Sequence, residues 1–184
     1  YAYITLQQDM PTIGYRTYGG NGLSLSGQND QNGKVQMLGG KPLIAQMGVY
    51  AYNNGNDKLQ PKDGKVVFIV PDGISYDSKD TADVQNLKNI KTVQNYAGSG
   101  KTAVIGDITN PSDFETSYGS IYYQVPLTDD GSMISGSYNI QSFFVFTNNN
   151  GKPGNMTDFQ VESGAKRTPD TYGTVSYTHL TLPT

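Results

Sequence analysis

Apolar residues occupy every second position in two long stretches of the chain, residues 42–52 and residues 137–147. Successive side chains of a strand point to opposite faces, so a period of two predicts strands with one face turned to a core. In the first stretch the alternating set is Leu43, Ala45, Met47, Val49 and Ala51. In the second stretch the residues that share a face are Tyr138, Ile140, Ser142, Phe144 and Phe146. We expect two long strands that each hide one face.

A third stretch, residues 65–70, is apolar without alternation. It is rich in β-branched residues and too short for a helix, which predicts a strand buried on both faces. Pro71 cannot donate to a sheet, and the following Asp-Gly favours a reversal, so we expect the strand to stop there. Ile74 and Tyr76 then resume the alternation.

Shorter strands are predicted at residues 88–94, 102–105, 121–127 and 158–161, separated by Gly-, Asn- and Asp-rich breaks. Pro126 predicts that the strand at 121–127 lies at a sheet edge. The pattern of residues 78–90 permits a short amphipathic helical turn capped by Ser78, but we expect irregular structure that leads into the strand at 88–94. Seven to nine strands without a convincing helix indicate an all-β fold, an Ig-like antiparallel β-sandwich.

The domain division that follows from this pattern places the sandwich at residues 41–165. Residues 1–40 hold two weak, Gly- and Asn-rich strand patterns, which are part of the sandwich or the remnant of a preceding domain. Residues 166–184 form a tail. Its last ten residues, 175–184, resemble a translated sequencing-adaptor sequence, and we expect them to be non-native. A genuine terminal strand is the alternative, which the alternation permits.

Composition narrows the classes of function. Only 16% of residues are charged, and 22 Gly and 14 Tyr suit a turn-rich β protein. The absence of Cys excludes disulfides, thiolate metal sites and a Cys nucleophile. A net charge of −3 provides no basic surface for nucleic acid. The sequence contains no run of about 18 apolar residues, so we do not expect direct membrane insertion.

The order of the motifs MGVYAYNNGNDKL and KVVFIVPDGISYDS resembles the repeated Ig-like extracellular domains of Gram-positive surface proteins. The later motifs GSGKTAVIGDI and GSYNIQSFFVFTNNNG are similar to the middle and closing strands of stalk domains in lactobacillus-type adhesins. The resemblance covers residues 42–162. It implies a non-enzymatic, extracellular, cell-wall-attached module that serves as a stalk spacer or presents a ligand-binding surface. Its implied partners are neighbouring repeat domains of the same chain and a host glycan or extracellular protein.

A carbohydrate-binding module is the alternative function, because aromatic rings near loops can stack on sugars. The candidate ligand-facing aromatics are Tyr15, Tyr18, Tyr118, Tyr122 and Tyr123. A glycosidase fragment is a more remote alternative, which would need two facing carboxylates. The acids available for it are Asp107, Asp113, Glu115, Asp129 and Asp130, which we interpret instead as solvated loop residues. We assign no catalytic residue, since a Ser triad would need a histidine and the only one, His179, lies in the suspect tail.

Residues 95–102 match the sequence motif of a phosphate-binding P-loop at all but one of its required positions. Asn95 stands where that motif needs Gly, and a strand-like run rather than a helix follows Lys101. We predict a hairpin turn here.

Two further chemistries stay open. Asn- and Asp-rich clusters offer oxygen ligands for Ca²⁺, although none fits an EF-hand, and no other cofactor is expected. The family resemblance also implies a Lys–Asn isopeptide cross-link, for which Lys41 or Lys65 and Asn139 or Asn148 are the candidates. Such a bond would form between adjacent strands near a buried acid, with loss of one ammonia.

Overall fold

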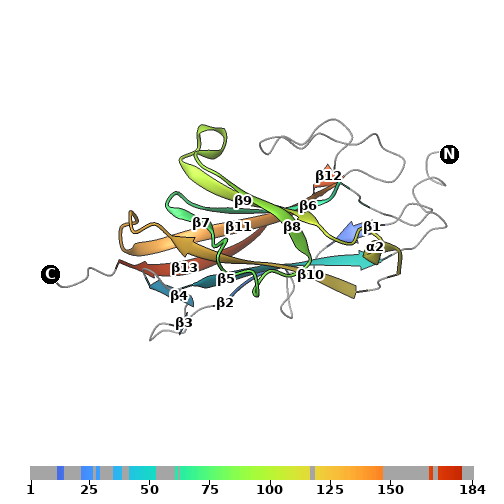
Figure 1. Ribbon diagram of the computed structural model, residues 1–184, viewed down its shortest axis with the longest axis horizontal. Helices are drawn as coiled ribbons and strands as arrows, with labels where there is room; N and C mark the ends of the chain where they lie inside the picture. Colours follow the sequence, from blue (N-terminus) through green and yellow to red (C-terminus); the bar gives the residue numbers. More distant parts are fainter. Residues whose placement is uncertain are drawn as a thin grey trace.

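Two β-sheets pack face to face in the computed structural model of the chain (Figure 1). The structure describes residues 12–14, 22–26, 28–29, 35–38, 42–52, 61, 63–116, 119–146, 166–167 and 170–179. The predicted all-β sandwich is confirmed. Among the described residues, no helix has the length and apolarity needed to cross a membrane.

The small sheet has the strand order β1-β5-β10-β7, and β2 also pairs with β5. All of its pairs are antiparallel. Its strands are β1 (Thr12–Gly14), β2 (Gly22–Ser26), β5 (Leu43–Tyr52), β7 (Ile74–Tyr76) and β10 (Gly119–Asp129).

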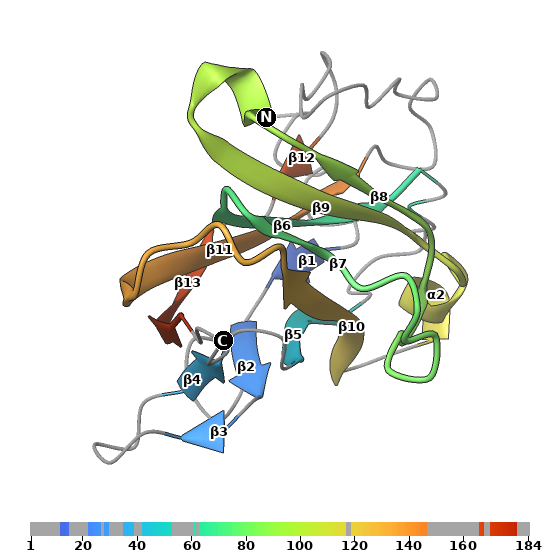
Figure 2. The ribbon, with the colours of Figure 1, turned by 60° about the vertical axis from the view of Figure 1, so that its left-hand side comes forward.

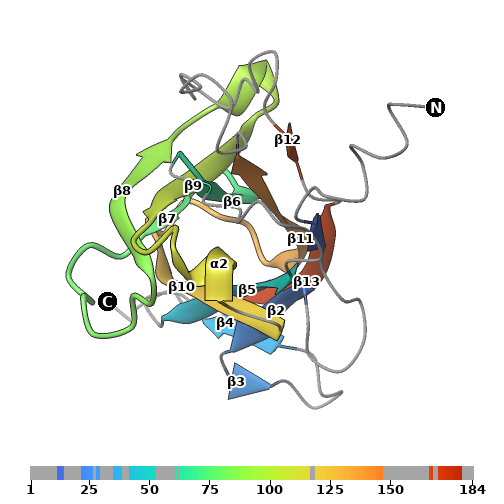
Figure 3. The same cartoon turned by 90° about the vertical axis from the view of Figure 1, so that its right-hand side faces the viewer.

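The large sheet has the order β3-β4-β13-β11-β6-β9-β8, and β12 also pairs with β11. Its strands are β3 (Gln28–Asn29), β4 (Val35–Leu38), β6 (Lys65–Pro71), β8 (Leu87–Val93), β9 (Lys101–Ile108), β11 (Gly136–Phe146), β12 (Lys166–Arg167) and β13 (Thr171–Thr178). Among the strands that the structure describes, only β4 and β13 pair in parallel. Two short helical turns, η1 (Tyr96–Gly98) and α2 (Asp113–Thr116), complete the described elements. Viewed from one end, the large sheet curves around the small one (Figure 3).

The predicted alternation of β5 and β11 produces the core between the sheets. Leu43, Ala45, Met47 and Val49 on β5 are each 0% exposed. They belong to one apolar cluster with Phe144 and other residues of β11. Each sheet therefore turns one apolar face inward, as the sequence pattern predicted. The expectation that β11 hides only one face is wrong for its last residues, because Phe143 and Val145 are buried on the opposite face of the large sheet.

The strand β6 is buried on both faces, which confirms the interpretation of its unbroken apolar run. Val66, Phe68 and Val70 join the core between the sheets. Val67 and Ile69 belong to a second buried cluster on the other face of the large sheet. The other members of this second cluster, which we call the outer cluster of the large sheet, are Ala103, Ile105, Phe143 and Val145.

The turn after β6 carries the chain from the large sheet to the small one, because β6 and β7 belong to different sheets. Gly73 adopts a φ of +101° in this turn. A Cβ at this position would lie 2.9 Å from Ser132 Oγ. Glycine is therefore needed both for its backbone conformation and for the close approach.

The prediction that residues 121–127 form an edge strand is wrong, because β10 lies between β5 and β7. The carbonyl of Pro126 accepts a hydrogen bond from the Asp77 amide, 3.0 Å away, just beyond the end of β7. The N–H and C=O of one strand residue point to the same side. Pro126 thus lacks its N–H at the border of the ladder, where β7 has already ended.

Several segments outside the predicted sandwich boundaries take part in the sheets. Strands β1 and β2, from residues 1–40, pair with β5. Residues 171–178, which overlap the suspect tail, form β13 and pair with β11 and β4. Val175 and Tyr177 of this strand are 0% and 1% exposed. The non-native origin of residues 175–184 stays a prediction, and the expected strand at 158–161 lies outside the described residues.

We expect Gly73→Ala to destabilise the fold more than Gly131→Ala. Both glycines have a positive φ, which costs a side-chain-bearing residue about 1–2 kcal/mol. A Cβ at Gly131 meets nothing within 4 Å, whereas at Gly73 it meets Ser132. Urea denaturation of the two variants measures the difference. Equal losses would show that the close approach at Gly73 has no energetic weight.

Substitutions in β13 test whether the C-terminal strand is part of the folded core. Val175→Asp buries an unpaired carboxylate and should lower the free energy of unfolding by roughly 3 kcal/mol or more. The neighbouring Thr174 is exposed, so Thr174→Asp should cost well below about 1 kcal/mol. Thermal and urea unfolding report both values. Similar, small effects from the two variants would contradict the placement of β13.

Candidate functional site

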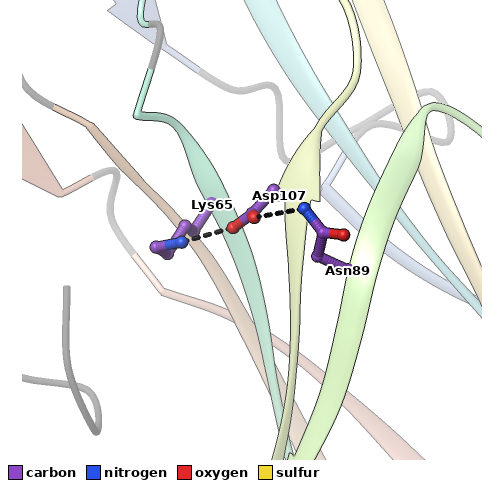
Figure 4. Close-up of polar contacts among 3 residues, drawn as sticks. All are labelled: Lys65, Asn89 and Asp107. Atoms are coloured by element: carbon purple, nitrogen blue, oxygen red, sulfur yellow. Dashed lines mark hydrogen bonds and ion pairs between the residues drawn. The ribbon is translucent and has the colours of Figure 1, made fainter.

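A lysine, an aspartate and an asparagine from three neighbouring strands of the large sheet form a hydrogen-bonded chain (Figure 4). Lys65 on β6 lies directly opposite Asp107 on β9. Its Nζ forms an ion pair with Asp107 Oδ1. The other carboxylate oxygen, Oδ2, accepts a hydrogen bond of 3.2 Å from Asn89 Nδ2 on β8. One carboxylate therefore joins an amine and an amide.

An irregularity in β8 accompanies the placement of Asn89. The pairing of β8 with β9 shifts register between Lys88 and Lys91. Asn89 has a φ of +51° within this bulge. Asparagine adopts left-handed backbone more readily than most residues, and bulges re-aim side chains. The bulge thus explains how an amide from the edge strand reaches the carboxylate.

The environment of Lys65, Asp107 and Asn89 favours an ion pair over covalent chemistry. The side chains of Lys65 and Asp107 are 21% and 30% exposed, and Asn89 is exposed. Formation of an amide bond needs an uncharged amine, which burial away from water would favour. Solvent at Asp107 keeps the charged pair favourable. As a partly exposed pair it contributes about 1 kcal/mol or less to stability.

The isopeptide pairing of Lys65 with Asn139 is wrong. Lys65 lies opposite Val145 on β11, and Asn139 is six positions further along that strand. At roughly 3.4 Å per residue the two are about 20 Å apart. Asn139 is exposed and its Oδ1 accepts a hydrogen bond from Thr174 Oγ1, 3.2 Å away. The other candidates, Lys41 and Asn148, lie outside the described residues.

The predicted ligand-facing tyrosines separate into two groups. Tyr122 is 40% exposed, whereas Tyr123 is 2% exposed. The prediction for Tyr123 is therefore wrong, because neighbouring residues of a strand face opposite sides. Its ring stacks on Phe144 with centroids 6.0 Å apart. Burial, and to a smaller extent Asp113, raises the pKa of Tyr123 far above its ordinary value. Tyr15, Tyr18 and Tyr118 lie outside the described residues.

Two of the acids considered for glycoside hydrolysis stabilise the turn after β10. Asp129 Oδ2 accepts hydrogen bonds from the Gly131 amide (3.0 Å) and the Tyr177 hydroxyl (2.8 Å). Asp130 Oδ1 accepts from the amide (2.9 Å) and hydroxyl (2.5 Å) of Ser132. These bonds lower the pKa of Asp130. Burial, followed by the hydrogen bond to Asp129, raises the pKa of Tyr177 to about 12.

Of the other three, Asp107 belongs to the chain with Lys65, Asp113 begins α2, and the side chain of Glu115 is outside the description. In the described part of the chain, no group of three His, Cys, Asp or Glu residues is arranged to hold a metal. Calcium binding stays a prediction. The geometry of these acids supports roles in turns and strand pairing.

The P-loop-like segment is a hairpin tip, as predicted. It connects β8 to β9, and the hairpin projects past the rest of the large sheet (Figure 2). Asn95 has a φ of +48°, and its Oδ1 accepts a hydrogen bond of 3.0 Å from the Gly100 amide. A strand rather than a helix begins at Lys101. The segment contains only the three-residue turn η1, and no α-helix follows Lys101 whose N-terminus could bind phosphate.

Sequence reasoning missed a polar corner, residues 83–86, that joins the start of β8 to the small sheet. The backbones of Gln85 and Gln124 exchange two hydrogen bonds of 3.1 Å. Asn86 Nδ2 donates to the Tyr122 carbonyl at 2.8 Å, and Gln124 Nε2 donates to the Asp83 carbonyl at 2.9 Å. The one local signal is Asn86, whose φ of +59° suits asparagine in a tight corner.

No known protein family and no curated protein matches the sequence. Among solved structures, AvmM, which catalyses macrocyclization in alchivemycin A biosynthesis, matches with a TM-score of 0.47 and 12% identity, covering 92% of this chain and 97% of that chain. The cohesin module of a Clostridium perfringens family 33 glycoside hydrolase matches with a TM-score of 0.42 and 12% identity, covering 85% and 95%. The C-terminal domain of the Streptococcus agalactiae AgI/II polypeptide BspA matches with a TM-score of 0.36 and 10% identity. This match covers 91% of this chain and 50% of that chain. These TM-scores are too low to support an argument about function.

We expect the intact mass of the purified chain to equal the mass calculated from its sequence. The partly exposed Asp107 keeps Lys65 in a charged pair, so no amide bond should form. Mass spectrometry separates the alternatives, since a Lys–Asn bond loses one ammonia and a Lys–Asp bond loses one water. The matched control is Lys65→Arg, which keeps the charge. A loss present in the original chain and absent from this variant would establish a cross-link at Lys65.

Proposed function

We propose that this chain is a non-enzymatic structural module of a bacterial surface protein, extracellular and attached to the cell wall, which acts as a stalk spacer or presents a ligand-binding surface. The sequence motifs at residues 42–162 that resemble stalk domains of Gram-positive adhesins support the proposal. The all-β sandwich agrees with them. Neighbouring domains of the same chain and an extracellular protein or host glycan would be the partners.

The observation that carries the proposal is the position of the first and last described strands. β1 lies at one end of the long axis of the molecule, and β13 ends at the opposite end (Figure 1). A module whose chain enters at one end and leaves at the other adds its full length to a stalk.

The direction of these strands also suits a load-bearing element. β1 runs antiparallel to β5, and β13 runs antiparallel to β11 and parallel to β4. Tension applied at the start of β1 and at the end of β13 would act along the axes of these strands (Figure 1). Hydrogen bonds between antiparallel strands are roughly perpendicular to the strands, so this tension loads the bonds of each strand pair together, along three residue pairs of β1 with β5 and seven of β13 with β11. Force across a strand pair would instead break them one after another.

The proposal assigns no catalytic residue. The described acids Asp107, Asp129 and Asp130 accept hydrogen bonds from neighbouring side chains or from the backbone. Such contacts explain the acids by strand pairing and turn geometry, without substrate.

Single-molecule force spectroscopy tests the spacer role. The chain lacks Cys, so engineered cysteines provide unique attachment points. We expect a higher unfolding force when handles are attached at the two chain ends than when they are attached at Ser137→Cys and His179→Cys. These two exposed positions lie at the same end of the β11–β13 pair, where force pulls the strands apart sideways.

Urea denaturation provides the control, because the two attachment variants must have the same free energy of unfolding. An end-to-end unfolding force equal to or below the sideways force would contradict a load-bearing role.

A further inference from the structure

The outward face of the small sheet presents one exposed aromatic ring beside polar side chains. On β10, Ile121, Tyr123 and Val125 point into the core, so the residues between them point outward. The same alternation on β5 and β2 defines the rest of this face, which we call the outer face. Its described members are Ser24, Ser26, Ile44, Gln46, Gly48, Ser120, Tyr122, Gln124, Pro126 and Thr128, of which Gly48 and Pro126 are buried.

Tyr122 lies on this face next to the polar corner. It is 40% exposed, and its carbonyl accepts the hydrogen bond from Asn86 Nδ2 that holds the polar corner. The residue directly opposite on β5 is Gly48, and the next one on β2 is Gly22. Because neither carries a side chain, the ring of Tyr122 has no bulky neighbour across the sheet in its own row.

The adjacent row supplies fixed amides. Gln124, Gln46 and Ser24 lie opposite one another on β10, β5 and β2. Gln46 Nε2 donates to Gln124 Oε1 at 3.2 Å, and Gln124 Nε2 donates to the Asp83 carbonyl. These bonds hold both amides in one orientation, and both side chains remain partly exposed. The face is therefore preorganised.

The outer face carries no charge among its described members, in a chain with 13 basic and 16 acidic residues. An anionic ligand would find no counter-charge there, because the charge that borders the face, Asp83 in the corner that holds Gln124, is itself negative. The core of a protein–protein interface needs several apolar anchors. Among the side chains of this face that the structure describes, Tyr122 is the one well-exposed aromatic ring, and amides and hydroxyls surround it. Its chemistry fits a neutral ligand with one apolar side and many hydroxyl groups.

We propose that the outer face binds a neutral oligosaccharide. One pyranose ring stacks on Tyr122 through its C–H groups, and the sugar hydroxyls bond to the amides of Gln46 and Gln124. A pyranose combines an apolar face with a rim of hydroxyls, which matches this combination of groups. The proposal does not depend on the spacer role.

Titration of the full ¹⁵N-labelled chain with cellohexaose, mannohexaose and chitohexaose tests the proposal by NMR. We expect at least one of these neutral sugars to shift the amide signals of Gln46, Tyr122 and Gln124. Tyr122→Ala should weaken that binding about tenfold or more, because the stacking surface is lost. Tyr122→Phe should retain most of the affinity.

Tyr172→Ala is the matched control. Tyr172 is 66% exposed on β13 of the large sheet, and its hydroxyl contacts Asp170. Its removal should leave binding unchanged. An oligogalacturonate of equal length tests the preference for a neutral ligand. Four results would overturn the proposal: no neutral sugar binds at millimolar concentration, the shifts lie elsewhere, Tyr122→Ala binds as the original chain does, or oligogalacturonate binds equally well.

Discussion

The burial of both faces of β6 is the constraint on which the rest of the structure depends. Val66, Phe68 and Val70 need the small sheet on one side, and Val67 and Ile69 need cover on the other. A strand that is apolar all round is stable only in the interior of a sheet, between two partners. β11 and β9 are those partners. The outer cluster, which includes Ala103, Ile105, Phe143 and Val145, follows from the same requirement.

Hydrogen bonds join the two sheets at one margin of the sandwich, whereas apolar side chains join them in the core. The corner at residues 83–86 joins β8 to β10 through backbone hydrogen bonds of Gln85 and side-chain bonds of Asn86 and Gln124. Asp83, Gln85 and Asn86 are exposed, and each of these hydrogen bonds contributes about 1 kcal/mol to stability. On the other side of the sandwich, Leu25 of β2 packs closely over Gly173 of β13. The two sheets are thus joined along both margins, and the corner also fixes the backbone of Tyr122.

The candidate sites show which contacts the local sequence pattern can predict and which it cannot. Alternation alone places Tyr123 with Val125 and Leu127 in the core, so the signal that separates it from Tyr122 was present in the sequence. The contact of Asn89 with Asp107 carried no such signal, because a bulge in the edge strand brings them together. The edge-strand prediction drawn from Pro126 was wrong for a related reason. Proline excludes one donor, but it does not report where the neighbouring strand ends.

The sequence by itself determined the strands β5, β6, β8, β9, β10 and β11, the apolar face that β5 and β11 turn to the core, and the burial of both faces of β6. These properties follow from side-chain chemistry at a period of two and from turn residues, which are local. Only the tertiary structure decided that β10 is central, that β13 pairs with both β4 and β11, and that Gln124 meets residues 83–86. Such pairings join segments far apart in the chain. They depend on the mutual fit of two whole sheets, which no short stretch of residues encodes.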